Sequence, residues 1–293
     1  MAPQPHPDDG SNSATQLEPA PSTSRFVEAS GLELNYLDYG TEGLPPMLCI
    51  HGGAAHGHWF DFVAPGFTAH YHVRALDLRG HGDSDWPQPR AYSFETYAKD
   101  LAEVVERLDL RDFVLIGHSM GGMVSLHYAA LYPGRVGKLV VVDTRMHMRP
   151  ERVTAMRETG ARPPKSYATQ AELVARYRLE PAGTQMAAPE VIRHMALHSG
   201  RQQPDGTWRH KFDRSVYANF ERVDGVPLWE KVRIPALLVR GEKSTRLGAE
   251  EFAAIRARAP LAQLAEVPAS DHHIPLDNPA GFVDAVKAFL DRS

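Results

Sequence analysis

The chain has 293 residues, which is enough for one large α/β domain with an insertion or for two smaller domains. Its net charge of −4 gives no reason to expect a nucleic acid or an anionic membrane as a partner. The single cysteine, Cys49, excludes an internal disulfide, and no run approaches the roughly 20 apolar residues that span a bilayer.

The first 24 residues are rich in proline, serine, aspartate and glutamine, with no basic residue before Arg25. This composition is typical of a disordered tail and differs from a secretory signal, which has a basic start and an apolar centre. We therefore predict a disordered tail over residues 1–24 and, by default, a cytoplasmic location.

Strand and helix patterns alternate from Phe26 onward. Residues 32–39 alternate apolar and polar side chains, which predicts an antiparallel edge strand. Short apolar runs, typical of parallel strands buried on both faces, occupy residues 47–50, 73–78, 113–116, 139–142 and 236–239, and residues 263–267 are a plausible last strand. Helical spacing lies between them, with Ser93 as a candidate cap. The alternation predicts an α/β fold with a mostly parallel sheet flanked by helices.

The alternation breaks between residues 145 and 230, a stretch too long for a plain loop. Its helical patterns predict a mainly helical cap inserted over the carboxyl edge of the strands, where open α/β sheets bind ligands. The core then comprises residues 25–144 and 231–293. Some apolar side chains of the insertion could shape a substrate pocket, but most such residues belong to a core, so we name no substrate-binding residue; those considered are Met146, Met148, Tyr177, Trp208, Phe212 and Tyr217.

The pentapeptide Gly117-His118-Ser119-Met120-Gly121 stands between an apolar strand pattern and a helix pattern. A serine flanked by glycines in this context is typical of a nucleophile elbow, a turn so tight that only small residues fit beside the serine. Ser119 is therefore the candidate catalytic nucleophile.

A serine hydroxyl needs a base and donors for a developing oxyanion. His272 and His273 follow the last predicted strand and are candidates for the base. The backbone amides of Gly53, in a glycine loop after a strand, and of Met120 are candidates for the oxyanion hole. A serine-based site needs no metal or other cofactor. Neither His56-x-His58 nor Asp271-His272-His273 has the spacing of a known metal motif, so we expect no catalytic metal.

Four motifs occur in an order and spacing that resemble the α/β-hydrolase fold family, from about Phe26 to the end. They are His51-Gly52-Gly53, the D-x-R-G-x-G-x-S loop over residues 77–84, the elbow over residues 117–122, and His272 with Asn278-Pro279 after it. In this family the catalytic histidine commonly stands seven residues before that proline, so the resemblance selects His272 over His273.

The acid departs from the family pattern. Relatives usually carry it as G-x-x-D after the strand predicted at residues 236–239, but here the motif ends in Ser244. A minority of the family uses an acid after the preceding strand, where this chain has Asp143. We take Asp143 as the acid, with Glu242, Asp271 or no acid as the open alternatives.

The resemblance implies a serine hydrolase that cleaves a small or medium, partly apolar carboxylic ester, lactone or thioester through an acyl-enzyme on Ser119. The alternatives on this fold are a C–C bond hydrolase, a cofactor-independent oxygenase and a non-catalytic ligand receptor. A haloalkane dehalogenase would need Asp in place of Ser119. We expect a small-molecule substrate, and the sequence leaves the oligomeric state open.

Overall fold

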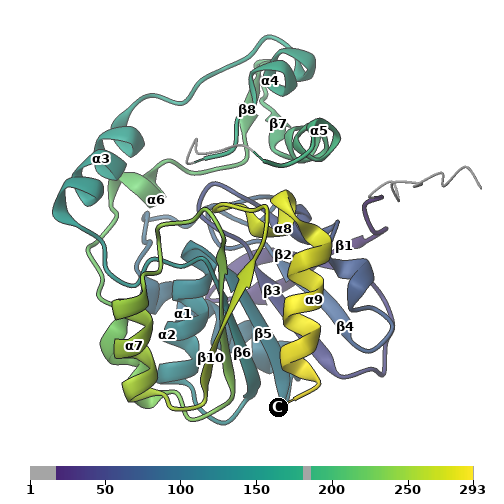
Figure 1. The fold of residues 1–293 in the computed structure, drawn as a ribbon. Helices are drawn as coiled ribbons and strands as arrows, with labels where there is room; N and C mark the ends of the chain where they lie inside the picture. Colours follow the sequence, from purple (N-terminus) through teal and green to yellow (C-terminus); the bar gives the residue numbers. More distant parts are fainter. Residues whose placement is uncertain (1–17, 181–185, 293) are drawn as a thin grey trace, which may run out of the picture.

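The computed structural model describes residues 18–180 and 186–292. Its centre is an eight-stranded sheet in the order β1-β2-β4-β3-β5-β6-β9-β10 (Figure 1). The strands are β1 (Thr23–Ala29), β2 (Leu32–Asp38), β3 (Pro46–Ile50), β4 (His72–Leu76), β5 (Phe113–His118), β6 (Val136–Val142), β9 (Ala236–Gly241) and β10 (Ala262–Val267). Only β1 and β2 run antiparallel to their neighbours in this sheet. The predicted α/β fold is confirmed.

The edge of the sheet differs from the prediction. The strand predicted at the edge, β2, is covered by β1, so the prediction of an edge position was wrong. No pattern in the sequence predicts β1, because this strand begins with Thr23, Ser24 and Arg25 and lacks an apolar alternation there. Without β1, the alternation in β2 predicts an edge strand. The last two residues assigned to the tail lie in β1, and residues 1–17 of that prediction lie outside the described residues.

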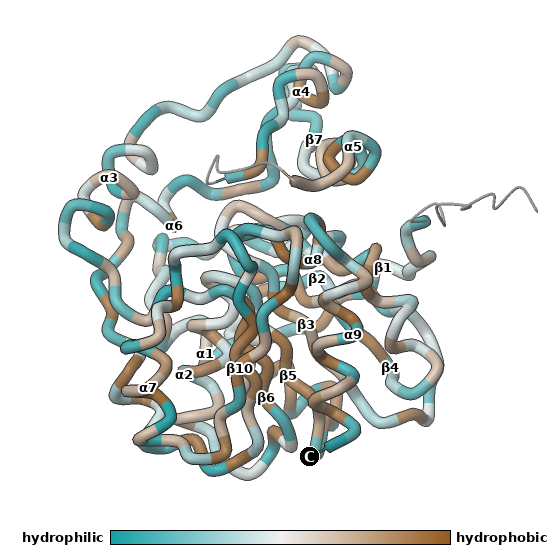
Figure 2. The backbone as a smooth tube through the Cα atoms, viewed as in Figure 1, coloured by the Kyte–Doolittle hydropathy of each residue, from teal (hydrophilic) through white to brown (hydrophobic). Residues whose placement is uncertain are grey.

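The parallel strands divide their side chains between two apolar clusters. Along β3, Leu48 and Ile50 point into one cluster, while Met47 and Cys49 point into the other. Helices α1 (Phe94–Arg107), α2 (Met120–Leu131) and α7 (Ala249–Arg258) cover the first face, and α9 (Pro279–Leu290) covers the second (Figure 1). The hydrophobic residues accordingly concentrate in the strands (Figure 2). Because the strands are buried on both faces, the residues that follow their carboxyl ends are held in fixed positions.

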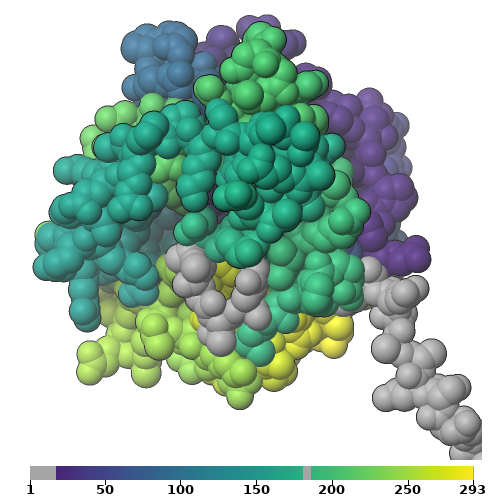
Figure 3. All heavy atoms as spheres, turned by 90° about the horizontal axis from the view of Figure 1, so that it is seen from above, coloured from purple at the N-terminus to yellow at the C-terminus, as the bar shows by residue number. Residues whose placement is uncertain are grey.

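The described part of the chain between β6 and β9 lies over one end of the sheet and covers the middle of the molecule when seen from above (Figures 1 and 3). Its elements are α3 (Pro150–Ala161), α4 (Gln170–Arg176), α5 (Pro189–His198), β7 (Gly200–Gln202), β8 (Trp208–His210), α6 (Ser215–Ala218) and η3 (Val226–Lys231). We call residues 145–230 the overlying segment. Trp229 of η3 is fully buried in the core cluster, so the end of this segment packs as part of the core. Among the described residues, no helix is both long and apolar enough to cross a bilayer.

Candidate active site

Ser119 lies at the turn between β5 and α2. Its backbone has φ 53° and ψ −115°, a strained conformation for a residue with a side chain. The neighbouring backbone is too close for larger residues, because a Cβ on Gly121 would stand 2.3 Å from the His51 carbonyl oxygen. The Ser119 amide donates to the Val142 carbonyl at 2.8 Å, and the Thr144 hydroxyl donates to the Ser119 carbonyl at 2.9 Å. These bonds fasten the elbow to the end of β6.

Asp143 and His272 are in direct contact. Asp143 follows β6, and its Oδ2 lies 2.7 Å from His272 Nδ1. His272 lies in the turn between β10 and the short helix α8 (Ile274–Asp277), and His118 Nε2 lies 2.8 Å from its carbonyl oxygen. Since β5 and β6 are neighbours, the elbow and the carboxylate reach the same end of the sheet. Three segments distant in sequence therefore meet at Ser119, Asp143 and His272.

The Asp143 carboxylate is buried beside two further polar groups. Ser244 Oγ donates to its Oδ2 at 2.9 Å, and Arg246 Nε lies 3.4 Å from the same oxygen. Burial raises the pKa of Asp143 to about 7, while the Ser244 hydrogen bond and the charge of Arg246 act in the opposite direction. Burial lowers the pKa of His272 well below its usual value, so this imidazole is neutral at neutral pH and can accept a proton.

The rival residues lie elsewhere. Glu242 is exposed, and its carboxylate accepts a hydrogen bond from the Ala269 amide at 2.8 Å. The Asp271 amide donates to the Asp277 carboxylate at 3.0 Å. The His273 ring meets Trp59 edge to face at 5.6 Å. The hydrogen-bonded geometry therefore favours Asp143 over Glu242 as the partner of His272.

The glycine loop after β3 passes beside the elbow. A Cβ on Gly52 would stand 3.2 Å from the Ser119 Cβ, and Gly53 lines a cavity together with Ser119, Met120 and His272. Tyr217 of the overlying segment closes this loop from above, because a Cβ on Gly53 would stand 2.7 Å from the Tyr217 hydroxyl. The two predicted amide donors thus border the same cavity as Ser119.

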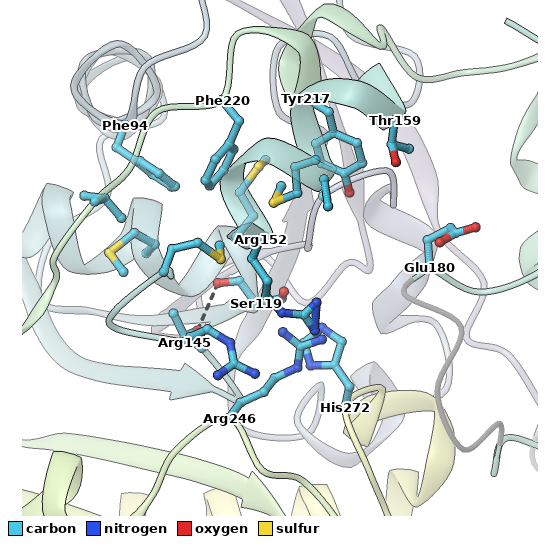
Figure 4. A pocket seen from close by; sticks show the side chains of 18 residues that line it. Phe94, Ser119, Arg145, Arg152, Thr159, Glu180, Tyr217, Phe220, Arg246 and His272 are labelled. Carbon is cyan, nitrogen blue, oxygen red and sulfur yellow. Dashed lines mark hydrogen bonds between the residues drawn. The ribbon is translucent and has the colours of Figure 1, made fainter. Parts of the chain in front are cut away.

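This cavity has a volume of about 260 Å³ and lies between the sheet edge and the overlying segment (Figure 4). Much of its wall is apolar, from Phe94, Met120, Met123, Met148, Met156, Phe220 and Val223. Of the six apolar residues considered from the sequence, Met148 and Tyr217 line the cavity. The other four, Met146, Tyr177, Trp208 and Phe212, are not among its lining residues.

Sequence reasoning missed the arginines of the cavity. Arg145, Arg152 and Arg246 surround Ser119 and His272 (Figure 4). Arg145 Nε is buried without a hydrogen-bond partner in the described part of the chain, and burial together with the charge of Arg152 lowers the pKa of Arg145. Burial also lowers the pKa of Arg246 to about 10. Glu180 is the acidic residue of the described lining, so positive charge prevails and favours an anionic ligand.

Comparisons with known proteins agree with this architecture. A family profile described as alpha/beta hydrolase fold matches residues 45–279. The 2-(acetamidomethylene)succinate hydrolase of Mesorhizobium japonicum is 30% identical over 275 residues, covering 92% of this chain and 95% of that protein. An esterase of Mycobacterium tuberculosis is 28% identical over 264 residues, covering 84% and 83%. The crystal structure of E-2-(acetamidomethylene)succinate hydrolase matches with a TM-score of 0.80 at 26% identity, covering 92% of this chain and 99% of that one. The chain therefore belongs to the alpha/beta hydrolase fold family.

Proposed function

We propose that this protein is a serine hydrolase that cleaves an ester, lactone or thioester in a small substrate bearing a carboxylate. Ser119 is the nucleophile, His272 the base and Asp143 the acid. The observation that carries the proposal is the 2.7 Å contact between Asp143 and His272 at the cavity that Ser119 lines. Residues 145–230 act as the cap that selects the substrate.

The reaction has two halves. Ser119 Oγ attacks the acyl carbon while His272 Nε2 takes its proton, and the collapsing intermediate expels a leaving group that receives this proton. Water, deprotonated by His272, then attacks the acyl-enzyme and releases the acid product and Ser119. Asp143 keeps the proton of His272 on Nδ1 and stabilises the imidazolium that forms in each half.

The developing oxyanion binds the backbone amides of Gly53 and Met120. Met120 opens α2, so its amide lies at the positive end of a helix dipole. Gly53 follows a glycine that packs against the Ser119 Cβ, which fits an amide close to the attacked carbonyl. Such preorganised donors stabilise charge that exists only in the transition state.

The carboxylate specificity rests on Arg145, Arg152 and Arg246. Guanidinium groups bind carboxylates through paired hydrogen bonds, and a buried guanidinium nitrogen without a partner is costly unless a ligand satisfies it. The relative from Mesorhizobium japonicum is named for a succinate, which is a dicarboxylate. The apolar wall opposite the arginines suits the remaining, partly apolar body of the substrate.

The test of the nucleophile is labelling by a fluorophosphonate, followed by intact mass spectrometry of the wild type, Ser119→Ala and Asp143→Asn. We expect one adduct on the wild type, none on Ser119→Ala and much slower labelling of Asp143→Asn. Ser119→Ala should also lower kcat about 10⁴-fold or more. A folded wild type that forms no adduct would overturn the hydrolase proposal in favour of the oxygenase or receptor alternatives.

The substrate class is tested with matched pairs of esters, such as a monoester of succinate against the corresponding neutral diester. The proposal expects a higher kcat/KM for the charged member of each pair, with the difference falling as salt is added. Equal rates for charged and neutral members would remove the carboxylate from the proposal and leave the hydrolase part intact.

A further inference from the structure

A second cluster of polar side chains lies away from Ser119. His58 Nδ1 and His194 Nε2 lie 2.8 Å and 2.7 Å from the same oxygen, Asp61 Oδ2. The ring of His198 stacks on that of His58 with 3.6 Å between the centroids, and its centroid lies 4.7 Å from that of His194. One potential ligand atom from each of these four residues lies within 4.8 Å of the others.

The four side chains come from two parts of the fold. His58 lies in the short helix η1 (Gly57–Phe60), and Asp61 follows it directly. His194 and His198 lie one turn apart on α5 and therefore share a face of that helix. Two histidines at i and i+4 on a helix present their nitrogens to a common point, a spacing used by zinc sites. The cluster thus joins the overlying segment to the core.

We propose that His58, Asp61, His194 and His198 bind one Zn²⁺ ion, which fastens α5 to the core beside η1. Three imidazoles and one carboxylate form a four-ligand set typical of tetrahedral zinc. Ligand atoms of such a site stand about 3.3 Å apart when the metal–ligand distances are about 2.0–2.1 Å. The four ligand atoms lie within 4.8 Å of one another, and binding turns the stacked rings of His58 and His198 apart so that each points a ring nitrogen at the ion.

The surroundings of Asp61 support a metal ligand. Its side chain is 3% exposed, and its other oxygen, Oδ1, accepts a hydrogen bond from the Tyr39 hydroxyl at 2.7 Å. A ligating carboxylate is commonly held in this way by a group outside the coordination sphere. His58, His194 and His198 are only partly buried, so an ion can reach them from solvent.

The alternative is a hydrogen-bonded cluster that takes no metal. In that arrangement Asp61 Oδ2 accepts a hydrogen bond from each of His58 and His194, and the ring of His198 only stacks on that of His58. A shared ion would give the ring nitrogens of all three histidines and Asp61 Oδ2 a common partner. Binding requires His58 and His194 to carry their protons on the ring nitrogens that face away from the metal.

The test is titration of metal-free protein with Zn²⁺ by calorimetry, and with Co²⁺ by visible absorption. The proteins compared are the wild type, His194→Gln/His198→Gln, and His70→Gln as a control, since His70 is exposed and outside the cluster. We expect one tight equivalent and a tetrahedral Co²⁺ spectrum for the wild type and the control. The double variant should lose both, with affinity lowered at least 10-fold.

A second readout does not depend on catalysis. Saturating Zn²⁺ should raise the Tm of the wild type and slow amide exchange in residues 189–198, with neither effect in the double variant. A wild type that binds no equivalent overturns the proposal. So does equal binding by the double variant, which would locate the ion elsewhere, such as at His118, His272 and His273.

Discussion

The sheet edge and the overlying segment make different contributions to the same cavity. Ser119, Asp143 and His272 belong to turns that the core sheet holds in place, and each is fixed by hydrogen bonds to backbone or side chains. Arg152, Met148 and Phe220 come from the overlying segment, and Arg152 makes no ion pair among the described residues. Under the proposed function, the edge performs the chemistry and the segment chooses the substrate. Changes at the edge should therefore affect kcat for every substrate.

The largest expected effect separates the two candidate acids. Asp143→Asn should lower kcat about 10⁴-fold for all substrates, because the imidazole loses its orienting charge. Glu242→Gln should leave kcat within about 2-fold, since Glu242 is exposed and bonded to the Ala269 amide. Steady-state kinetics of the two purified variants checks this, and the opposite ranking would move the acid to Glu242.

A compensating change sharpens the same point. In Asp143→Asn/Ser244→Asp a carboxylate returns at the position where the family usually carries it. Because Ser244 Oγ lies only 2.9 Å from Asp143 Oδ2, the new side chain reaches the neighbourhood of His272. The double variant should recover at least about 10-fold of the lost kcat. A double variant no better than Asp143→Asn would show that the turn after β9 cannot supply the acid.

A smaller and substrate-dependent effect is expected in the overlying segment. Arg152→Gln should raise KM for a carboxylate-bearing ester about 10- to 100-fold, the value of a charged hydrogen bond, and leave the neutral analogue almost unchanged. Arg176→Gln is a matched control, because Arg176 lies on α4 outside the cavity. Equal losses for both substrates in Arg152→Gln would mean that the residue serves folding or catalysis.

The smallest effect concerns pH. Activity requires the Asp143 carboxylate in its charged form, so kcat/KM should fall as the pH drops through its pKa of about 7. The Ser244 hydrogen bond lowers this pKa, and Ser244→Ala should raise it and move the acid limb of the profile to higher pH by up to about one unit. At pH 9 the variant should match the wild type. The neighbouring Thr245→Ala should show no shift.

Much of the fold followed from sequence patterns, because parallel strands buried on both faces leave unbroken apolar runs. The elbow was predictable for a local reason, since a strained turn needs glycines at fixed positions around Ser119. β1 was missed because an edge strand that is largely exposed carries no apolar alternation. Asp143 was chosen as the acid because Ser244 stands where relatives carry an aspartate. The contact of Asp143 with His272 could not be predicted, because it depends on tertiary packing.

The residues proposed to bind the ligand were less predictable. Arg145 and Arg152 lie at the start of the overlying segment and Arg246 lies after β9, and nothing in their local sequence distinguishes them from the many exposed arginines. The histidine cluster did leave a signal, because His194 and His198 have i, i+4 spacing in the stretch that forms α5. That spacing alone did not predict a metal site, because the other two potential ligands, His58 and Asp61, come close to α5 only in the folded structure.

The position of Asp143 also bears on how this scaffold can change over generations. With the proposed acid at the end of β6, the turn after β9 does not have to supply the carboxylate that orients His272. That turn carries Arg246. Its Nε lies 3.4 Å from Asp143 Oδ2, and its side chain also lines the cavity beside Ser119. Substitutions at Arg246 can therefore change ligand preference and the acidity of the Asp143 carboxylate together. In this chain, adaptation of that turn to a new ligand is coupled to the pH dependence of the proposed reaction.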